Sequence, residues 1–249
     1  MILNQMTNIN DLKILVINLK DDDSRRELAK KELEKFPVNY SFVEAINGRD
    51  QNLSVAVYPE KKVKRLTGYS LTRNELGCFM SHQKCWHIAA ELDSPCLILE
   101  DDFKLSDSFH EAIVFAFQNF DKWELLRLQA LTSVEKEKVH ASGEKFSIVS
   151  NIGDPLGATA YLVKPDSAIK LIKKSKQIYE PLDHYLEHFS RHNIEFKALL
   201  PYPVTNSGIE TTIPDRPYNE RRLRGIRKFK RSIFRFLDRK LSNDPWFLK

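Results

Sequence analysis

The stretch C-L-I-L-E-D-D, Cys96 to Asp102, places four residues of buried-strand type directly before three consecutive carboxylates. A short apolar run without alternation suits a strand covered on both faces, as in a parallel sheet flanked by helices. Carboxylates at the carboxyl end of such a strand lie where open α/β sheets bind ligands. Adjacent like charges repel, and hard oxygen ligands favour Mg²⁺ or Mn²⁺ over zinc. The stretch therefore predicts an α/β fold with a metal-assisted ligand site. A solvated acidic turn before the helix that begins near Asp107 is the alternative interpretation.

Length and composition favour one sizeable α/β unit followed by a tail. The chain has 249 residues, of which 42% are apolar, and this is enough for a substantial core. No run approaches the roughly 18 to 20 apolar residues that span a bilayer. Residues 1–12 have neither the basic region nor the long apolar region of a signal peptide, so we expect a cytoplasmic protein. Cys78, Cys85 and Cys96 form no C-x-x-C zinc pattern, and we interpret them as reduced core residues.

The basic character of the chain belongs to its C-terminal segment. Residues 216–249 carry a net charge of +9, which leaves −4 for residues 1–215. Between residues 218 and 241, aliphatic and aromatic residues recur at helical spacing among arginines. This predicts a basic amphipathic helix that lies on an anionic membrane surface. A helix docked on its own domain is the alternative, and the interleaved aliphatic residues argue against nucleic-acid binding. We therefore divide the chain into a domain of residues 1–215 and a membrane-associating segment of residues 216–249.

The remaining patterns predict alternating strands and helices. Strands are expected at 13–19, 39–46, 96–99, 123–130, 146–149, 157–163 and 196–200. Helices are expected at 25–35, from a capping box at Thr72 to about Leu92, and at 107–119, 165–174 and 181–192. Residues 51–69 are expected to be irregular, and residues 134–144 to be a charged excursion from the sheet.

Several pieces match one family in the same order. The matching pieces are I-N-L with Arg25 and Arg26 after the first strand, F-V-E-A-I-N-G at 42–48, L-T-R-N-E-L-G-C-F-M-S-H at 71–82, L-I-L-E-D-D at 97–102, G-A-T-A-Y-L-V at 157–163 and P-L-D-H-Y-L at 181–186. On these pieces, which extend over residues 14 to about 213, the chain resembles glycosyltransferase family 25. Asn47 departs from the aspartate that such sequences often carry, which puts an acidic role at that position in doubt.

The resemblance implies a GT-A-type, Rossmann-like nucleotide-sugar transferase with a mostly parallel central sheet flanked by helices. The usual donor of the family is UDP-galactose, and the usual acceptor is the glycan of a lipid-linked oligosaccharide or lipopolysaccharide core. Transfer from a nucleotide sugar requires neutralising the leaving diphosphate, which a carboxylate-bound Mn²⁺ or Mg²⁺ achieves as a Lewis acid. On the family's D-x-D-like motif, Asp102 is predicted to be the main metal ligand. Glu100 is predicted to contact the nucleotide or the metal, and Asp101 to support both.

An inverting transferase also requires a base that takes the proton of the acceptor hydroxyl. The resemblance points to Asp183 in P-L-D as this base. An aspartate after proline is also a preferred helix cap, so both interpretations stay open on residue type alone. Asp154 and Glu180 are the reserve candidates.

Four more side chains are candidates for donor binding. Arg25 and Arg26 are predicted to contact the diphosphate or uridine, because guanidinium groups pair well with phosphate oxygens; solvated charges on a helix surface are the alternative. Ser81 and His82 precede the acidic motif on the predicted helix, and the resemblance suggests that one of them faces the donor. His184 and His188 have the i, i+4 spacing of a zinc pair, but the sequence lacks H-E-x-x-H. We therefore interpret those two as surface or core histidines.

Two other functions remain open from the sequence. Donor preference depends on a few pocket residues, so a glucosyltransferase or another hexosyltransferase on the same scaffold is one alternative. The second is an inactive transferase-like adaptor for a membrane or a protein partner, against which the intact E-D-D motif and Asp183 argue.

Overall fold

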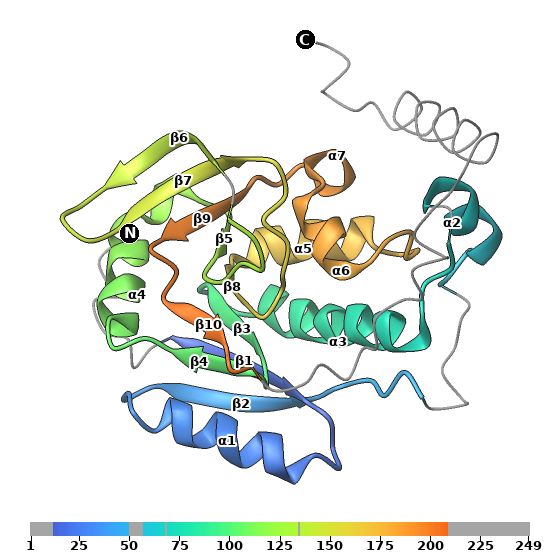
Figure 1. The fold of residues 1–249 in the computed structure, drawn as a ribbon, viewed down its shortest axis with the longest axis horizontal. Coiled ribbons are helices and arrows are strands. Elements are labelled where there is room, and N and C mark those ends of the chain that lie inside the picture. The colour runs from blue at the N-terminus through green and yellow to red at the C-terminus, as the bar shows by residue number, and fades with distance from the viewer. Residues whose placement is uncertain (1–11, 50–56, 68, 134, 209–249) are drawn as a thin grey trace.

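An eight-stranded sheet with helices on both faces forms the centre of the molecule (Figure 1). The structure is a computed structural model, and it describes residues 12–49, 57–67, 69–133 and 135–208. The predicted amphipathic helix within 216–249 lies outside the described residues, and so do residues 51–56 and 68 of the predicted irregular stretch. Within the described ranges, no helix is both long and apolar enough to cross a membrane.

The sheet has the strand order β2-β1-β3-β8-β5-β9-β7-β6. The strands are β1 (Lys13–Asn18), β2 (Asn39–Glu44), β3 (Cys96–Glu100), β5 (Leu125–Arg127), β6 (Glu135–Ser142), β7 (Ser147–Ile152), β8 (Ala160–Val163) and β9 (Phe196–Leu200). Strands β2, β1, β3, β5, β9 and β6 run in one direction, whereas β8 and β7 run against them. The predicted α/β fold with a mostly parallel central sheet is therefore confirmed.

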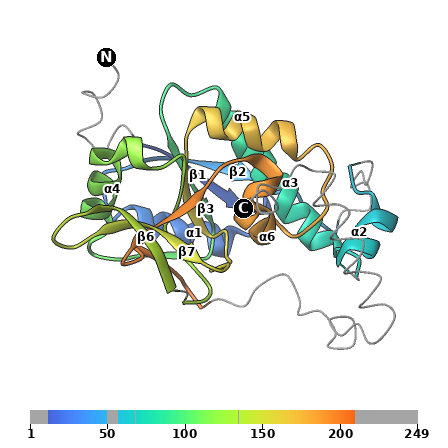
Figure 2. The same ribbon diagram turned by 90° about the horizontal axis from the view of Figure 1, so that it is seen from above.

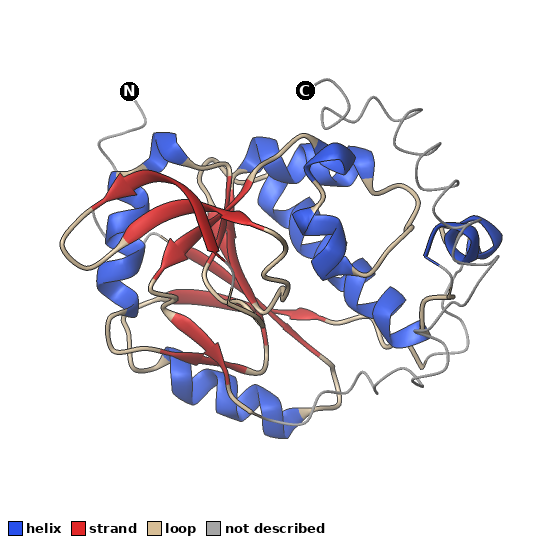
Figure 3. Ribbon diagram, turned by 45° about the horizontal axis from the view of Figure 1, so that its top comes forward, coloured by secondary structure: helices blue, strands red, loops and turns tan. Residues whose placement is uncertain are grey.

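Helices cover the sheet in two layers; Figure 3 draws the helices in blue and the strands between them in red. Helices α1 (Asp23–Leu33) and α4 (Phe109–Gln118) pack on one face, and α3 (Arg73–Ala90), α5 (Pro165–Lys174) and α6 (Leu182–Glu187) pack on the other. Strand β3 packs against both layers of helices. Cys96 and Ile98 belong to the core beneath α3, α5 and α6, whereas Leu97 and Leu99 belong to the core beneath α1 and α4. All four side chains are fully buried, as the run without alternation predicted.

The expected local signals at two helix starts are present. Thr72 and Glu75 form the capping box of α3, with each side chain bonded to the other's backbone nitrogen. Pro165 occupies the first turn of α5, where its missing N–H is no loss. The glycines of two matched motifs also meet, because a Cβ on Gly77 would lie 2.5 Å from the carbonyl oxygen of Ile46, and a Cβ on Gly48 would collide with the backbone at Arg73. The chain after β2 therefore packs directly against the start of α3.

The structure corrects four predictions about secondary structure. A helix, α2 (Glu60–Thr67), stands within residues expected to be irregular. Its buried Val63 stands among charged residues, so the apolar signal was weak. The charged excursion is strand β6, which lies at the sheet edge and pairs with β7 through its backbone, without needing apolar residues. Residues 181–192 form two helices, α6 and α7 (Phe189–His192), because the backbone at His188 is not helical. A small ribbon of β4 (Phe103–Leu105) and β10 (Val204–Asn206) was not predicted.

Candidate functional site

The E-D-D motif lies at the sheet edge where β1, β3 and β5 end and β8 begins. Glu100 is level with Ile17 of β1, and its backbone nitrogen donates to the carbonyl oxygen of Thr159, just before β8. Arg127 at the end of β5 pairs with Tyr161 of β8. The topology therefore gathers polar residues from four strands at one edge, the edge at which open α/β sheets bind ligands. Figure 2 shows the strands of this edge from above.

Asp101 and Asp102 share one cation, Arg25 of α1. The Arg25 Nε atom lies 3.1 Å from Asp101 Oδ1, and Nη2 lies 3.3 Å from Asp102 Oδ2. Asn18, the last residue of β1, donates from Nδ2 to Asp101 Oδ2 over 2.8 Å. All three charged side chains are largely buried, with 11 to 13% of each exposed. Arg25 is held at the start of α1 because Asp22 caps that helix by accepting from the Arg25 backbone nitrogen.

This group carries more negative than positive charge, because two aspartates share one arginine. Burial, followed by the charge of Glu100, raises the pKa of Asp102 to about 7 despite the presence of Arg25. Burial also raises the pKa of Asp101. In addition, Asp102 Oδ1 and Asn18 Oδ1 are buried without a hydrogen-bond partner among the described residues. Two unpartnered hard oxygens beside a destabilised carboxylate fit an oxygen-seeking divalent cation.

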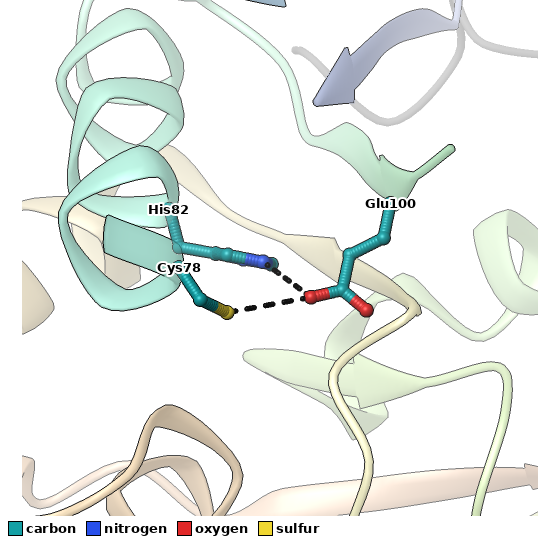
Figure 4. A group of neighbouring side chains, drawn as sticks. All are labelled: Cys78, His82 and Glu100. Carbon is teal, nitrogen blue, oxygen red and sulfur yellow. Dashed lines mark hydrogen bonds and ion pairs between the residues drawn. The ribbon is translucent and has the colours of Figure 1, made fainter. Parts of the chain in front are cut away.

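Glu100 points to the opposite face of the edge, toward α3 (Figure 4). Its Oε1 atom lies 3.3 Å from His82 Nε2 and 3.5 Å from Cys78 Sγ, and its Oε2 atom accepts from Thr159 Oγ1 over 3.2 Å. Burial alone would raise the pKa of Glu100, but these donors, His82 foremost, outweigh burial and lower it. Glu100 is therefore held as a carboxylate.

A chain of buried hydrogen bonds fixes the orientation of His82. Trp86 Nε1 donates to the Tyr161 hydroxyl over 2.9 Å, and that hydroxyl lies 2.8 Å from His82 Nδ1. Since burial raises the pKa of Tyr161 well above its usual range, the phenol keeps its proton and can donate it to Nδ1. The Nε2 atom of His82 then carries the hydrogen that faces Glu100. The resemblance suggested that either Ser81 or His82 faces the donor. The structure places His82 fully buried beside Glu100, and its contact with a donor stays a prediction.

A buried ion pair, which the sequence did not reveal, holds the loop before β8. Arg127 donates to the carbonyl oxygens of Leu156 and Gly157 and pairs with Glu187 of α6. Glu187 also accepts from the backbone nitrogen of Leu156 over 3.1 Å. Leu156 and Gly157 both have positive φ angles, 57° and 90°. The one available signal was an arginine inside the predicted strand L-L-R-L, and nothing in the sequence linked it to Glu187.

Asp183 is the second residue of α6 and not its N-cap, which is Pro181. Its Oδ1 accepts from the backbone nitrogen of His184 over 2.9 Å. The Cys78 thiol has a strongly raised pKa because of burial, then of Glu100, and further because of the charge of Asp183. Helix α6 packs on the same face of the sheet as α3, so Asp183 lies on the Glu100 side of the edge.

The remaining candidates lie apart from the acidic motif or are engaged elsewhere. The Arg26 guanidinium stacks 4.3 Å above the Phe42 ring on the outer side of β2. Ser81 accepts from the Ile46 nitrogen and donates to the Gly77 carbonyl, both over 2.7 Å. Glu180 is bonded to His188 and Arg191, and Asp154 is exposed beside α6. Their contacts with a donor or an acceptor stay predictions.

Comparison with known proteins gives one consistent result. The model of the family described as "Glycosyltransferase family 25 (LPS biosynthesis protein)" matches residues 11–186. Procollagen galactosyltransferase 1-A of Xenopus laevis is 25% identical over 82% of this chain, and human procollagen galactosyltransferase 2 is 32% identical over 46%. Inactive glycosyltransferase 25 family member 3 of Mus musculus is 27% identical over 75% of the chain. The alignments cover 38%, 20% and 33% of these relatives, respectively, so the chain matches less than half of each.

Proposed function

Because the chain belongs to glycosyltransferase family 25, we propose that it transfers a hexose, galactose from UDP-galactose, to a glycan acceptor with inversion. The galactosyltransferase names of several relatives support this donor. The family description, which mentions LPS biosynthesis, supports a lipooligosaccharide or lipopolysaccharide core as the acceptor.

The observation that carries the proposal is the unmet demand for positive charge at Asp102. Its unpartnered Oδ1, the unpartnered Asn18 Oδ1 and the raised pKa of Asp102 support a site for Mn²⁺ or Mg²⁺. Asp102 would be the main ligand, with Glu100 as the second predicted contact. A bound divalent cation would neutralise charge on the leaving diphosphate as a Lewis acid. Arg25 and Asn18 contact Asp101 and hold it beside Asp102. In the proposed complex, Arg25 also contacts the diphosphate.

Asp183 is the proposed base. In this role it takes the proton of the acceptor hydroxyl while that oxygen attacks the anomeric carbon from the face opposite UDP. The position of Asp183 supports this role, because α6, which carries Asp183, is joined to the loop before β8 by the Arg127–Glu187 pair and by the bond from the Leu156 nitrogen to Glu187. Asp183 is partly exposed and so remains accessible to an acceptor.

The proposed setting is the inner face of the cytoplasmic membrane. The basic, aliphatic-rich sequence of residues 216–249 supports binding to an anionic surface next to a lipid-linked acceptor. Sedimentation with anionic liposomes tests this, because removal of residues 216–249 should abolish cosedimentation of the protein.

The second candidate function is that of an adaptor without transferase activity. It is supported by relatives whose names include the word "inactive". A glucosyltransferase or another hexosyltransferase is the nearer alternative. Both are decided by the same assay: hydrolysis of UDP-galactose, UDP-glucose and other UDP-sugars with and without Mn²⁺.

The assay tests Asp183 through a matched pair of variants. Asp183→Asn should lose orders of magnitude in turnover with an unchanged melting temperature. Asp166→Asn is the control, because Asp166 is likewise the second residue of its helix, α5, and is exposed. Asp183→Asn with the turnover of Asp166→Asn would remove Asp183 as the base, and the absence of any UDP-sugar turnover in the unaltered protein would favour the inactive candidate.

A further inference from the structure

A second cluster of potential metal ligands lies outside the E-D-D edge. Asp154, His184 and His188 each offer one ligand atom, and these atoms all lie within 4.8 Å of one another. Asp154 comes from the loop between β7 and β8, where Gly153 has a φ of 88°. The two histidines are four residues apart at α6, with ring centroids separated by 6.3 Å. The i, i+4 spacing brings two imidazoles to one helix face, as in metal-binding histidine pairs.

An outer carboxylate orients one of these histidines. Glu180 Oε2 lies 2.7 Å from His188 Nδ1, and Glu180 Oε1 accepts from Arg191 Nε over 3.1 Å. The Glu180 side chain is 10% exposed. A carboxylate that binds one imidazole nitrogen fixes the tautomer and leaves the other nitrogen, here Nε2, for a metal. This arrangement is independent of the clustering of the three ligands, and it is the arrangement that metal-bound histidines commonly have.

The kind of metal follows from the ligands. Two imidazoles and one carboxylate suit Zn²⁺, with a fourth position open to water or another ligand, and they suit Mg²⁺ poorly. The oxygen-rich Asp102 edge has the opposite preference.

We propose that Asp154, His184 and His188 bind Zn²⁺, with Glu180 as the residue that positions His188. The ion would connect the loop before β8 to α6 beside the Arg127–Glu187 pair. That loop leads to Thr159, which donates to Glu100, and α6 carries Asp183. Zinc would thereby fix two parts of the proposed active site relative to each other.

A rival set of ligands must be separated by experiment. Cys78, His82 and Glu100 also lie within metal-binding distance of one another. However, both ring nitrogens of His82 already have partners, Tyr161 and Glu100. A Cys78→Ser variant therefore reports on this rival cluster, and an Asp102→Asn variant reports on the E-D-D edge.

The experiment measures Zn²⁺ binding by the full-length chain after chelator treatment, with calorimetry and metal analysis, so it needs no enzymatic activity. The unaltered protein, Cys78→Ser and Asp102→Asn should each bind one Zn²⁺ per chain and gain melting temperature on binding. The double variant His184→Ala/His188→Ala should lose both effects, whereas His110→Ala, a change at an exposed histidine of α4, should keep them. Glu180→Gln should weaken binding about 10- to 100-fold. Melting of each metal-free variant shows whether it is folded.

Co²⁺ substitution gives a second readout, because imidazole-bound tetrahedral cobalt absorbs in the visible range, and this band should be absent from the double histidine variant. The proposal is overturned if the unaltered protein binds no Zn²⁺. It is equally overturned if the double variant binds Zn²⁺ as tightly as the unaltered protein, or if binding is lost in Cys78→Ser instead.

Discussion

The two faces of the sheet edge shift the pKa values of neighbouring carboxylates in opposite directions. On the α3 face, Glu100 is surrounded by His82, Cys78 and Thr159, and its pKa is lowered. On the α1 face, Asp101 and Asp102 share Arg25, and the pKa of Asp102 rises to about 7. Both faces are largely buried, so burial alone does not explain the difference. The number of donors available to each carboxylate does.

This difference indicates how the E-D-D motif divides its work. A buried carboxylate that accepts several hydrogen bonds is stabilised in its charged form by the protein itself. A buried carboxylate with few donors is destabilised when charged, and a bound cation would stabilise it. Glu100 thus has three protein donors around it, whereas Asp102 has an oxygen without a partner among the described residues, which supports Asp102 as the main proposed metal ligand. Neighbouring residues can have these two roles because β3 ends at Glu100, and Asp101 and Asp102 belong to the turn after it, where strand alternation no longer sets the direction of a side chain.

The largest expected effect comes from removing the open oxygen. Asp102→Asn should lower metal-stimulated hydrolysis of UDP-galactose on the order of 10²- to 10³-fold, since a metal ion contributes several kcal/mol of charge stabilisation. Its unfolding free energy should not fall, because the substitution removes a repulsive charge. Asp121→Asn, at a 65% exposed side chain, is the control. Normal metal dependence in Asp102→Asn would refute the division of roles.

The next largest effect tests the donor shell behind Glu100. Tyr161→Phe leaves Trp86 Nε1 and His82 Nδ1 without their shared partner, which should cost about 2 kcal/mol of unfolding free energy, measured by urea denaturation. Tyr179→Phe removes a hydroxyl at the surface and should change stability by less than about 0.5 kcal/mol. Equal midpoints for the two variants would show that the Trp86–Tyr161–His82 chain is not a stabilising network.

Burial and hydrogen bonding also set the charge of a buried histidine, His192. His192 accepts from the Ile194 nitrogen through Nδ1 and contacts the Tyr185 carbonyl through Nε2, so its partners match the neutral ring. Burial lowers its pKa from 6.5 to about 4. Between these values the unfolded chain binds more protons than the folded one, so stability falls as the pH falls.

When the pH falls from 7.5 to 5.5, His192 should therefore lower the free energy of unfolding by about 1 kcal/mol, because the slope is about 1.36 kcal/mol per pH unit below pH 6.5. The measurement is the difference in pH dependence between the unaltered protein and His192→Gln in denaturant titrations. Parallel curves for the two proteins would contradict the assignment of a neutral, buried imidazole.

The smallest effect concerns the cation shared on the α1 face. Arg25→Lys keeps the charge, but an ammonium group lacks the planar fork that reaches both aspartates. We expect a loss of stability below about 1 kcal/mol and a KM for UDP-galactose raised several-fold. Arg26→Lys tests the second arginine predicted to contact the donor: a similar rise in KM would support that contact, and an unchanged KM would argue against it.

The acidic edge was predictable because its signals are local. An uninterrupted apolar run predicted that β3 is covered on both faces, which the structure confirms, and the charges after it predicted a carboxylate group at the end of the strand. The capping box of α3 and Pro165 of α5 are likewise sequence-local features with direct structural meaning. Strand β6 was missed because backbone pairing at a sheet edge requires no apolar pattern.

The donor shell and the ion pair were not predictable, because they depend on tertiary contacts. His82 and Tyr161 are separated by 79 residues, and Arg127 and Glu187 by 60. No periodicity relates such residues. Similarly, the i, i+4 pair His184 and His188 was visible as a spacing, but the contributions of Asp154 and Glu180 became apparent only in the folded chain.

The reversed direction of β8 has a consequence for how this scaffold can diversify. A parallel strand in that position would bring the loop after it to the E-D-D edge, whereas β8 brings the loop before it. That loop is anchored by Arg127 and Glu187 on one side and reaches Glu100 through Thr159 on the other. Changes of length or residue type between these anchors would alter the surface beside Asp183, the proposed base, while leaving the E-D-D edge untouched. Acceptor choice and donor chemistry can thus evolve as separate traits within one sheet.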